Sequence, residues 1–200
     1  MKNYRLYTGS YTGGAPGNGV AELEFGEAGL RVEKSWGPLT DPSYVQPVGD
    51  KVYAVEEMEG RAAVVELSKA GEPGRLRRFA IPGSGVCHVS ACGPYLYASG
   101  YAGGCLTGLR AGDGAACCFL QHEGKGPDAL RQEAPHVHSA QPSPDGKHLF
   151  VADLGTDRLY QYDIDSQGGL TLHEAQPWVQ TAPGQGPRHF AFHPNRKWLY

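Results

Sequence analysis

The sequence of 200 residues has no apolar run long enough to span a membrane, and no apolar signal region follows its first residues. It also has no stretch in which lysine and arginine gather, and its formal net charge is −3 at pH 7. A protein that binds nucleic acid needs a clustered basic face. We therefore expect neither a membrane nor a nucleic acid among its partners.

Cysteine is sparse and shows no metal-binding pattern. The five cysteines form no Cys-x-x-Cys pair and no metal-like grouping with histidine. The pair His136-x-His138 offers only two ligands to zinc, and the sequence shows no third. We therefore expect free thiols in a reducing cytoplasm, and neither a metal nor another cofactor.

Glycine and proline, by contrast, are abundant. The 29 glycines and 15 prolines make up more than a fifth of the chain, which favours many short strands joined by turns over long helices. A short pattern of apolar and aromatic residues recurs, and its first apolar residue falls at 6, 52, 96, 149 and 199. A repeat of this length built from short strands predicts an all-β fold, a β-propeller with one four-stranded blade per repeat.

Each repeat can be divided into strands and turns. The third complete repeat predicts an inner strand at 139–141, a turn at 144–147, and further strands at 149–153, 159–164 and 170–173. The earlier repeats predict strands at 20–25, 30–32, 63–67 and 76–79, with a turn at 71–74 and a glycine-rich, less distinct strand at 104–108. The strand at 149–153 is mostly apolar, so we expect it to be buried on both faces. The polar segment 121–135 predicts an irregular loop at the mouth of the propeller.

About four blades are present, and four repeats of this width do not close a ring. An open stack of blades would expose apolar faces and a strand edge. We therefore expect residues 1–200 to form one propeller domain that is incomplete at its C-terminus. The chain would then be part of a longer protein, or two or more chains would complete a ring; the sequence does not define the oligomeric state.

Six short motifs lie between the repeats: Thr-Gly-Ser-Tyr-Thr at 8–12, Asp-Pro-Ser-Tyr at 41–44, Val-Cys-His-Val-Ser at 86–90, Arg-Gln-Glu-Ala-Pro-His-Val-His-Ser at 131–139, Val-Ala-Asp-Leu-Gly-Thr-Asp at 151–157 and Gly-Pro-Arg-His-Phe-Ala-Phe-His-Pro at 186–194. Together they resemble the bacterial lactonase family of seven-bladed propellers, over the whole length of the chain. The resemblance implies a cytoplasmic hydrolase of sugar lactones, with 6-phosphogluconolactone of the pentose phosphate pathway as its substrate.

The spacing of the repeats also defines a register. His138 lies 11 residues before Leu149, and Arg188 lies 11 residues before Leu199, so these two occupy the same position in consecutive blades. By motif, Ser43 and Cys87 match them in the earlier blades. Side chains alternate along a strand, so one set faces the channel and the next, Tyr44, His88, Ser139 and His189, faces a neighbouring blade. The resemblance implies that His138 and Arg188 belong to the channel set.

The chemistry of lactone opening suggests roles for these residues. A neutral imidazole, here His138, can take a proton from the attacking water. Arg188 suits the developing oxyanion or an anionic substituent of the substrate. We expect His136 and Arg131, on the mouth loop, to bind the anionic end of the substrate. Asp153 is a further substrate-binding candidate, although its position at the end of a strand favours capping of a turn.

Other polar residues have simpler interpretations. His88 and His189 are expected to be structural hydrogen-bonding residues, and Asp157 a solvated loop carboxylate. His122, His148 and His173 are expected at the surface. The chain has no Gly-x-Ser-x-Gly elbow and no Ser/His/Asp order typical of a covalent acyl enzyme, so direct attack by water is the simpler hypothesis.

Two other functions fit the same pattern. A lactonizing cycloisomerase acting on a muconate-type substrate would use the same histidine for proton transfer. A propeller without catalytic activity would bind partners on its upper face, because a fold alone does not define a function. Sequence alone does not separate these possibilities from hydrolysis.

Overall fold

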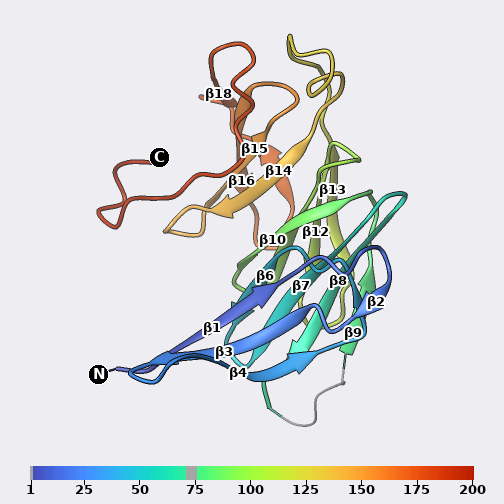
Figure 1. Ribbon diagram of the computed structural model, residues 1–200. Coiled ribbons are helices and arrows are strands. Elements are labelled where there is room, and N and C mark those ends of the chain that lie inside the picture. The colour runs from blue at the N-terminus through green and yellow to red at the C-terminus, as the bar shows by residue number, and fades with distance from the viewer. Residues whose placement is uncertain (1, 71–75) are drawn as a thin grey trace.

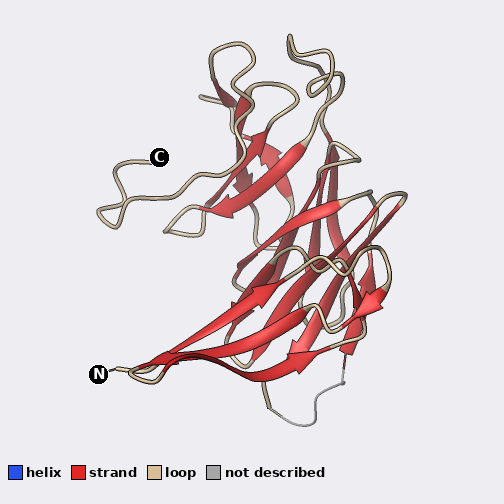
Figure 2. Ribbon diagram, viewed as in Figure 1, coloured by secondary structure: helices blue, strands red, loops and turns tan. Residues whose placement is uncertain are grey.

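The computed structural model describes residues 2–70 and 76–200, and every regular element in these ranges is a β-strand (Figure 2). No helix formed by these residues has the length and hydropathy to cross a membrane. The turn expected at 71–74 lies outside the described residues. The five cysteines are all free, as predicted.

The strands form consecutive antiparallel sheets, each of them one propeller blade (Figure 1). The first sheet contains β1 (Tyr4–Gly9), β3 (Val20–Gly26) and β4 (Gly29–Trp36), and a small ribbon of β2 (Pro16–Gly17) and β5 (Leu39–Thr40) lies in its connections. The second contains β6 (Val45–Val48), β7 (Lys51–Met58), β8 (Arg61–Ser68) and β9 (Leu76–Ala80). The third contains β10 (Val86–Cys92), β11 (Tyr95–Gly100), β12 (Cys105–Arg110) and β13 (Ala116–Gln121). The fourth contains β14 (Val137–Pro142), β15 (His148–Asp153), β16 (Arg158–Ile164), β17 (Leu170–Leu172) and β18 (Trp178–Gln180).

These sheets confirm the predicted blades, with some differences in detail. The turn at 144–147 is present, and the Gly146 N–H donates to the Ser143 carbonyl oxygen at 2.8 Å. The glycine-rich segment forms the regular and almost wholly buried strand β12. The strand predicted at 149–153 is buried on both faces as expected except at Phe150, which remains partly exposed. The short strand β18, which pairs with β16, was not predicted.

Hydrophobic side chains from neighbouring sheets form the core. Val64 and Val89 belong to the cluster between the second and third sheets. Leu106 and Leu149 belong to the cluster between the third and fourth. Because each blade buries one apolar face against the next, the sheets follow one another around an arc (Figure 1).

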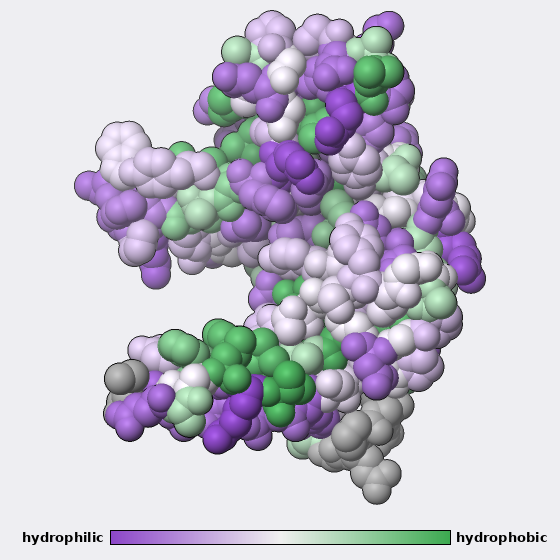
Figure 3. Space-filling model, viewed as in Figure 1, coloured by the Kyte–Doolittle hydropathy of each residue, from purple (hydrophilic) through white to green (hydrophobic). Residues whose placement is uncertain are grey.

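The faces at the two ends of the arc are more exposed. Figure 3 shows hydrophobic atoms gathered over the arm that the first sheet forms, and a hollow between this arm and the C-terminal segment. Tyr4, Leu6, Phe25, Leu30 and Val32 of this sheet are all more than two fifths exposed. Residues 181–200 form no strand and make a single isolated bridge between Phe192 and Leu199.

The packing between blades predicts a large effect for Leu106→Ala, because this side chain is fully buried between the third and fourth sheets. We expect a loss of about 2–5 kcal/mol in the free energy of unfolding, from lost burial and the cavity left behind. Leu130→Ala is the control, since Leu130 is 89% exposed. Urea denaturation measures both, and equal midpoints for the two variants would contradict the assigned packing.

Candidate active site

The inner strands of the third and fourth sheets carry β-bulges at matching positions. In β10 the pairing with β11 shifts between Val86 and His88, and in β14 the pairing with β15 shifts between Val137 and Ser139. The extra residues are therefore Cys87 and His138. A bulge re-aims the side chain of the inserted residue, which explains how both leave the ladder and turn toward the channel.

The predicted channel set lines one cavity of about 300 Å³, called the central cavity here. All four members of the set, Ser43, Cys87, His138 and Arg188, contribute to it. Tyr44 and His189, which were expected to face a neighbouring blade, line it too, so the separation of the two sets remains a prediction. Its lining residues come from the second, third and fourth sheets, from the loops beside the strands and from the C-terminal segment: Tyr11, Ser43, Tyr44, Glu57, Cys87, Tyr101, His138, Arg188 and His189.

His138 and Arg188 are in direct contact. The Nε–H of Arg188 donates to Nε2 of His138 at 3.0 Å, so this nitrogen is unprotonated and the imidazole carries its proton on Nδ1. Nδ1 is buried and has no hydrogen-bond partner among the described residues. The backbone of the segment that carries Arg188 is held by β14, because Ser139 Oγ donates to the Arg188 carbonyl at 2.7 Å and Gln141 Nε2 donates to that of Phe190 at 2.9 Å.

The surroundings keep His138 neutral. Burial lowers its pKa from 6.5 to about 4, and the positive charge of Arg188 contributes in the same direction. The Cys87 thiol in the same cavity is also uncharged, because burial raises its pKa to about 12. A thiol in this state is a poor nucleophile, so the bases of the central cavity are imidazole and carboxylate.

A second cavity, of about 250 Å³, adjoins the first and shares Arg188 with it. We call it the arginine cavity, because Arg131 and Arg188 both line it. Gln132, only 2% exposed, holds the mouth loop in place: its Nε2 donates to the Leu154 carbonyl at 2.8 Å and to Asp157 Oδ1 at 2.7 Å. The irregular loop predicted at 121–135 thus brings Arg131 to a cavity, as the sequence led us to expect.

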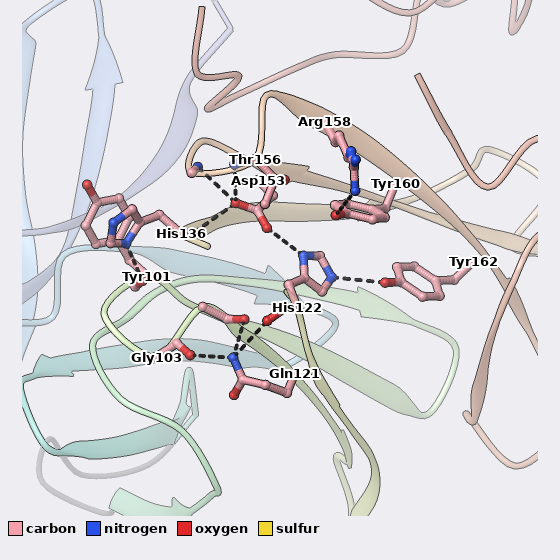
Figure 4. Close-up of polar contacts among 12 residues, drawn as sticks. Tyr101, Gly103, Gln121, His122, His136, Asp153, Thr156, Arg158, Tyr160 and Tyr162 are labelled. Atoms are coloured by element: carbon pink, nitrogen blue, oxygen red, sulfur yellow. Dashed lines mark hydrogen bonds and ion pairs between the residues drawn. The ribbon is translucent and has the colours of Figure 1, made fainter. Parts of the chain in front are cut away.

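Asp153 does not reach either cavity, contrary to the expectation that it binds substrate. Its side chain is fully buried, and its Oδ1 accepts hydrogen bonds from the N–H groups of His136, Gly155 and Thr156 (Figure 4). The turn-capping interpretation is therefore the correct one. The other oxygen, Oδ2, contacts Nδ1 of His122 at 2.7 Å.

His136 also lies away from the two cavities. Its Nδ1 contacts the Tyr101 carbonyl at 3.0 Å, and its Nε2 contacts Glu133 at 3.2 Å. Its ring stacks on that of Tyr101, with centroids 4.5 Å apart. Both nitrogens are thus engaged within the protein, so His136 supports Tyr101, which lines the central cavity, instead of facing the substrate.

Two surface predictions are wrong. His122 is 5% exposed and lies between Asp153 and the Tyr162 hydroxyl, which is 3.0 Å from its Nε2 (Figure 4). Asp157 is 2% exposed and accepts hydrogen bonds from the N–H groups of Gly184 and Gly186. Both residues have partners distant in the sequence, which a reading of local polarity does not reveal.

Three residues of the central cavity were missed by the sequence analysis. Tyr11 donates from its hydroxyl to Glu57 Oε2 at 2.9 Å, and Tyr101 lies edge to face with His138 at 5.6 Å between ring centroids. Glu57 is the penultimate residue of β7 and follows Glu56, after the apolar run at 52–55. A carboxylate at the channel end of a buried strand was the available signal for it.

The expected structural role of His88 agrees with its environment. It is 2% exposed, and its Nδ1 accepts a hydrogen bond from the Ala140 N–H at 3.4 Å. Its pKa lies far below 6.5, at about 3, chiefly because of burial. His189, in contrast, is exposed and lines the central cavity, with its ring 4.9 Å from that of His138.

Comparison with known proteins agrees with a β-propeller fold. The sequence profile of the family described as "Lactonase, 7-bladed beta-propeller" matches residues 5–200. A Bacillus subtilis protein named 6-phosphogluconolactonase is 32% identical over 100% of this chain and 59% of its own length. A crystal structure from Bacteroides fragilis superposes with a TM-score of 0.88 at 30% identity, over 99% of this chain and 60% of that one. The periplasmic gluconolactonase of Pseudomonas aeruginosa gives a TM-score of 0.78 at 26% identity, over 100% of this chain and 61% of that one.

The fold and these comparisons therefore define a β-propeller of the lactonase type. The chain belongs to the family of lactonases with a seven-bladed β-propeller. It spans about 60% of the length of the relatives described above.

The buried histidines predict a pH dependence of stability. A histidine whose pKa is lower in the folded than in the unfolded chain binds fewer protons when folded, so folding is favoured less as the pH falls below 6.5. This loss continues through a pKa of about 4 for His138 and about 3 for His88. We expect His88→Asn to show a shallower decline of the free energy of unfolding with falling pH than the parent. Urea titrations at several pH values measure the two slopes, and identical slopes would argue against a neutral, buried His88.

Proposed function

We propose that the protein carrying this chain hydrolyses a sugar lactone, with 6-phosphogluconolactone converted to 6-phosphogluconate. The observation that supports this best is the pair of adjoining cavities that share Arg188, one with His138 and the other with Arg131. A phosphorylated lactone has two parts that need different environments, a carbonyl that becomes an oxyanion and a permanently charged phosphate. The names of the relatives from Bacillus subtilis and Pseudomonas aeruginosa support the same substrate class.

The proposed reaction begins with the Arg188–His138 hydrogen bond. The lactone carbonyl oxygen competes with His138 for the Arg188 guanidinium, which stabilises the oxyanion of the tetrahedral intermediate. His138 Nε2, released from Arg188, accepts a proton from the water as its oxygen attacks the carbonyl carbon. The bond between the carbonyl carbon and the ring oxygen then breaks, and the same proton passes from Nε2 to that oxygen. The product is the open hydroxy acid.

Glu57 is a second candidate for the base. Its carboxylate lines the central cavity together with His138, and it is held by the Tyr11 hydroxyl. Glu57 is the general base if Arg188 keeps its hydrogen bond to His138 during the reaction. In that case His138 is a positioning residue, which orients the guanidinium.

The arginine cavity is proposed to hold the phosphate. Arg131 has no ion-pair partner among the described residues, and the side chain of Arg188 is bound only through Nε. A guanidinium group offers several N–H donors to phosphate oxygens. We place this reaction in the cytoplasm, a proposal that the five free cysteines support.

The first functional prediction concerns the central cavity. We expect Arg188→Ala and His138→Ala each to lower kcat/KM for 6-phosphogluconolactone by about 10²-fold or more, because each removes a group that acts in the transition state. Tyr44→Phe is the matched control in the same cavity and is expected to leave the rate within about twofold. The assay is lactone hydrolysis in a pH-stat, corrected for the spontaneous reaction.

The comparison of Glu57→Gln with His138→Ala separates the two candidate bases. The base is the residue whose replacement removes the acidic limb of the pH–rate profile. A parent protein that leaves hydrolysis at its spontaneous rate would refute the proposed activity. Unchanged rates in both the Arg188 and the His138 variants would refute the proposed site.

The second functional prediction concerns substrate choice. We expect Arg131→Gln to raise KM for the phosphorylated lactone by about tenfold or more, while kcat/KM for unphosphorylated gluconolactone changes little, because one charge-assisted contact to phosphate is lost. Arg158→Gln, an arginine that lies over the Trp178 ring and lines neither cavity, is the control. Equal effects on both substrates would show that Arg131 does not recognise the phosphate.

A further inference from the structure

A cluster of two histidines and an aspartate lies on the fourth sheet, away from both cavities. His148 begins β15, Asp163 lies near the end of β16, and His173 follows β17 directly. His148 and Asp163 are direct cross-strand partners, and Asp163 is paired with Thr171 on its other side. Thr171 and His173 are two residues apart, so their side chains lie on the same face of the sheet. His173 is therefore on the same face as Asp163, in the diagonal position.

The two imidazoles turn the same nitrogen toward one carboxylate. Nδ1 of His148 is 2.7 Å from Asp163 Oδ1, and Nδ1 of His173 is 2.9 Å from the same oxygen and 3.1 Å from Oδ2. The three possible ligand atoms all lie within 4.8 Å of one another. Among the described residues, no other group of three histidine, cysteine or acidic side chains converges in this way.

The cluster is accessible to solvent. The side chains of His148, Asp163 and His173 are 30%, 46% and 29% exposed. This leaves room for water as a further ligand.

We propose that His148, Asp163 and His173 bind a divalent transition-metal ion of the Zn²⁺ type, with water completing the coordination. Two imidazole nitrogens favour zinc over calcium or magnesium, which prefer oxygen ligands. With bonds of about 2.0–2.1 Å, tetrahedral ligands lie roughly 3.3 Å apart, so the contacts to Asp163 need to open by only about half an ångström. On binding, each neutral imidazole carries its proton on Nε2 and uses the Nδ1 lone pair for the metal.

The ion would connect three adjacent strands at one end of the fourth sheet. The ligands come from β15, β16 and the residue after β17, so binding stabilises their pairing in proportion to RT ln(1 + [metal]/Kd). The short outer strand β17 has only three residues and pairs only with β16. This site is structural and does not depend on the proposed lactone hydrolysis.

Isothermal titration of the metal-free chain with ZnCl₂ tests the proposal. We expect one Zn²⁺ per chain, and at least a tenfold weaker affinity in each of His148→Ala, His173→Ala and Asp163→Asn. His193→Ala is the control, because His193 lies on the C-terminal segment outside the cluster. We also expect Zn²⁺ to raise the Tm of the parent and of the control, but not of the three variants.

A spectroscopic probe keeps the test decisive if a variant folds poorly. Co²⁺ bound to the parent and to His193→Ala should show the visible absorption of a tetrahedral site with nitrogen and oxygen ligands, and Asp163→Asn should weaken it. Circular dichroism of the metal-free variants shows whether each one is folded. Failure of the parent to bind Zn²⁺, or binding that is unchanged in all three ligand variants, would overturn the proposal.

Discussion

The buried carboxylate of Asp153 connects the segments on which the candidate site depends. One oxygen accepts hydrogen bonds from the N–H groups of Gly155 and Thr156, and these bonds shape the turn after β15. The same oxygen accepts a hydrogen bond from the N–H of His136, which fixes the start of β14. The other oxygen contacts His122, which follows β13 near the start of the mouth loop. An unpaired buried carboxylate would be costly, so these partners define each other's positions. The inner strand that carries His138 therefore starts from a point fixed by the interior of the protein.

From that point, two local features lead to the site. The bulge in β14 turns His138 out of the ladder, and Ser139 and Gln141 then hold the backbone that carries Arg188. These contacts explain why residues 50 positions apart meet at 3.0 Å. The same bulge in β10 places Cys87 at the matching position of the preceding blade. The third and fourth sheets therefore share a bulged inner strand, whereas the pairing of β6 with β7 in the second sheet is regular.

The sequence predicted the parts of the structure that repeat. The recurrence of short apolar strands predicted the blades, and the equal spacing before Leu149 and Leu199 predicted that His138 and Arg188 share a position. His122 and Asp157 were misplaced because their partners are distant along the chain: Asp153 and Tyr162 for the first, Gly184 and Gly186 for the second. Burial of a polar residue depends on such partners, and no local pattern contains them. The same limitation applies to His148, Asp163 and His173, whose convergence follows only from strand pairing.

In the proposed reaction, the position of Arg188 between the two cavities affects how the substrate is recognised. If a phosphate is bound by Arg131 alone, the guanidinium of Arg188 remains available to the lactone carbonyl; if Arg188 also binds the phosphate, its charge is partly neutralised before the reaction. Before substrate binds, the hydrogen bond from Nε to His138 directs this edge of the guanidinium toward the central cavity, which favours the first arrangement. In that arrangement, the binding of the phosphate by Arg131 orients the lactone ring, and the charge of Arg188 stabilises the transition state.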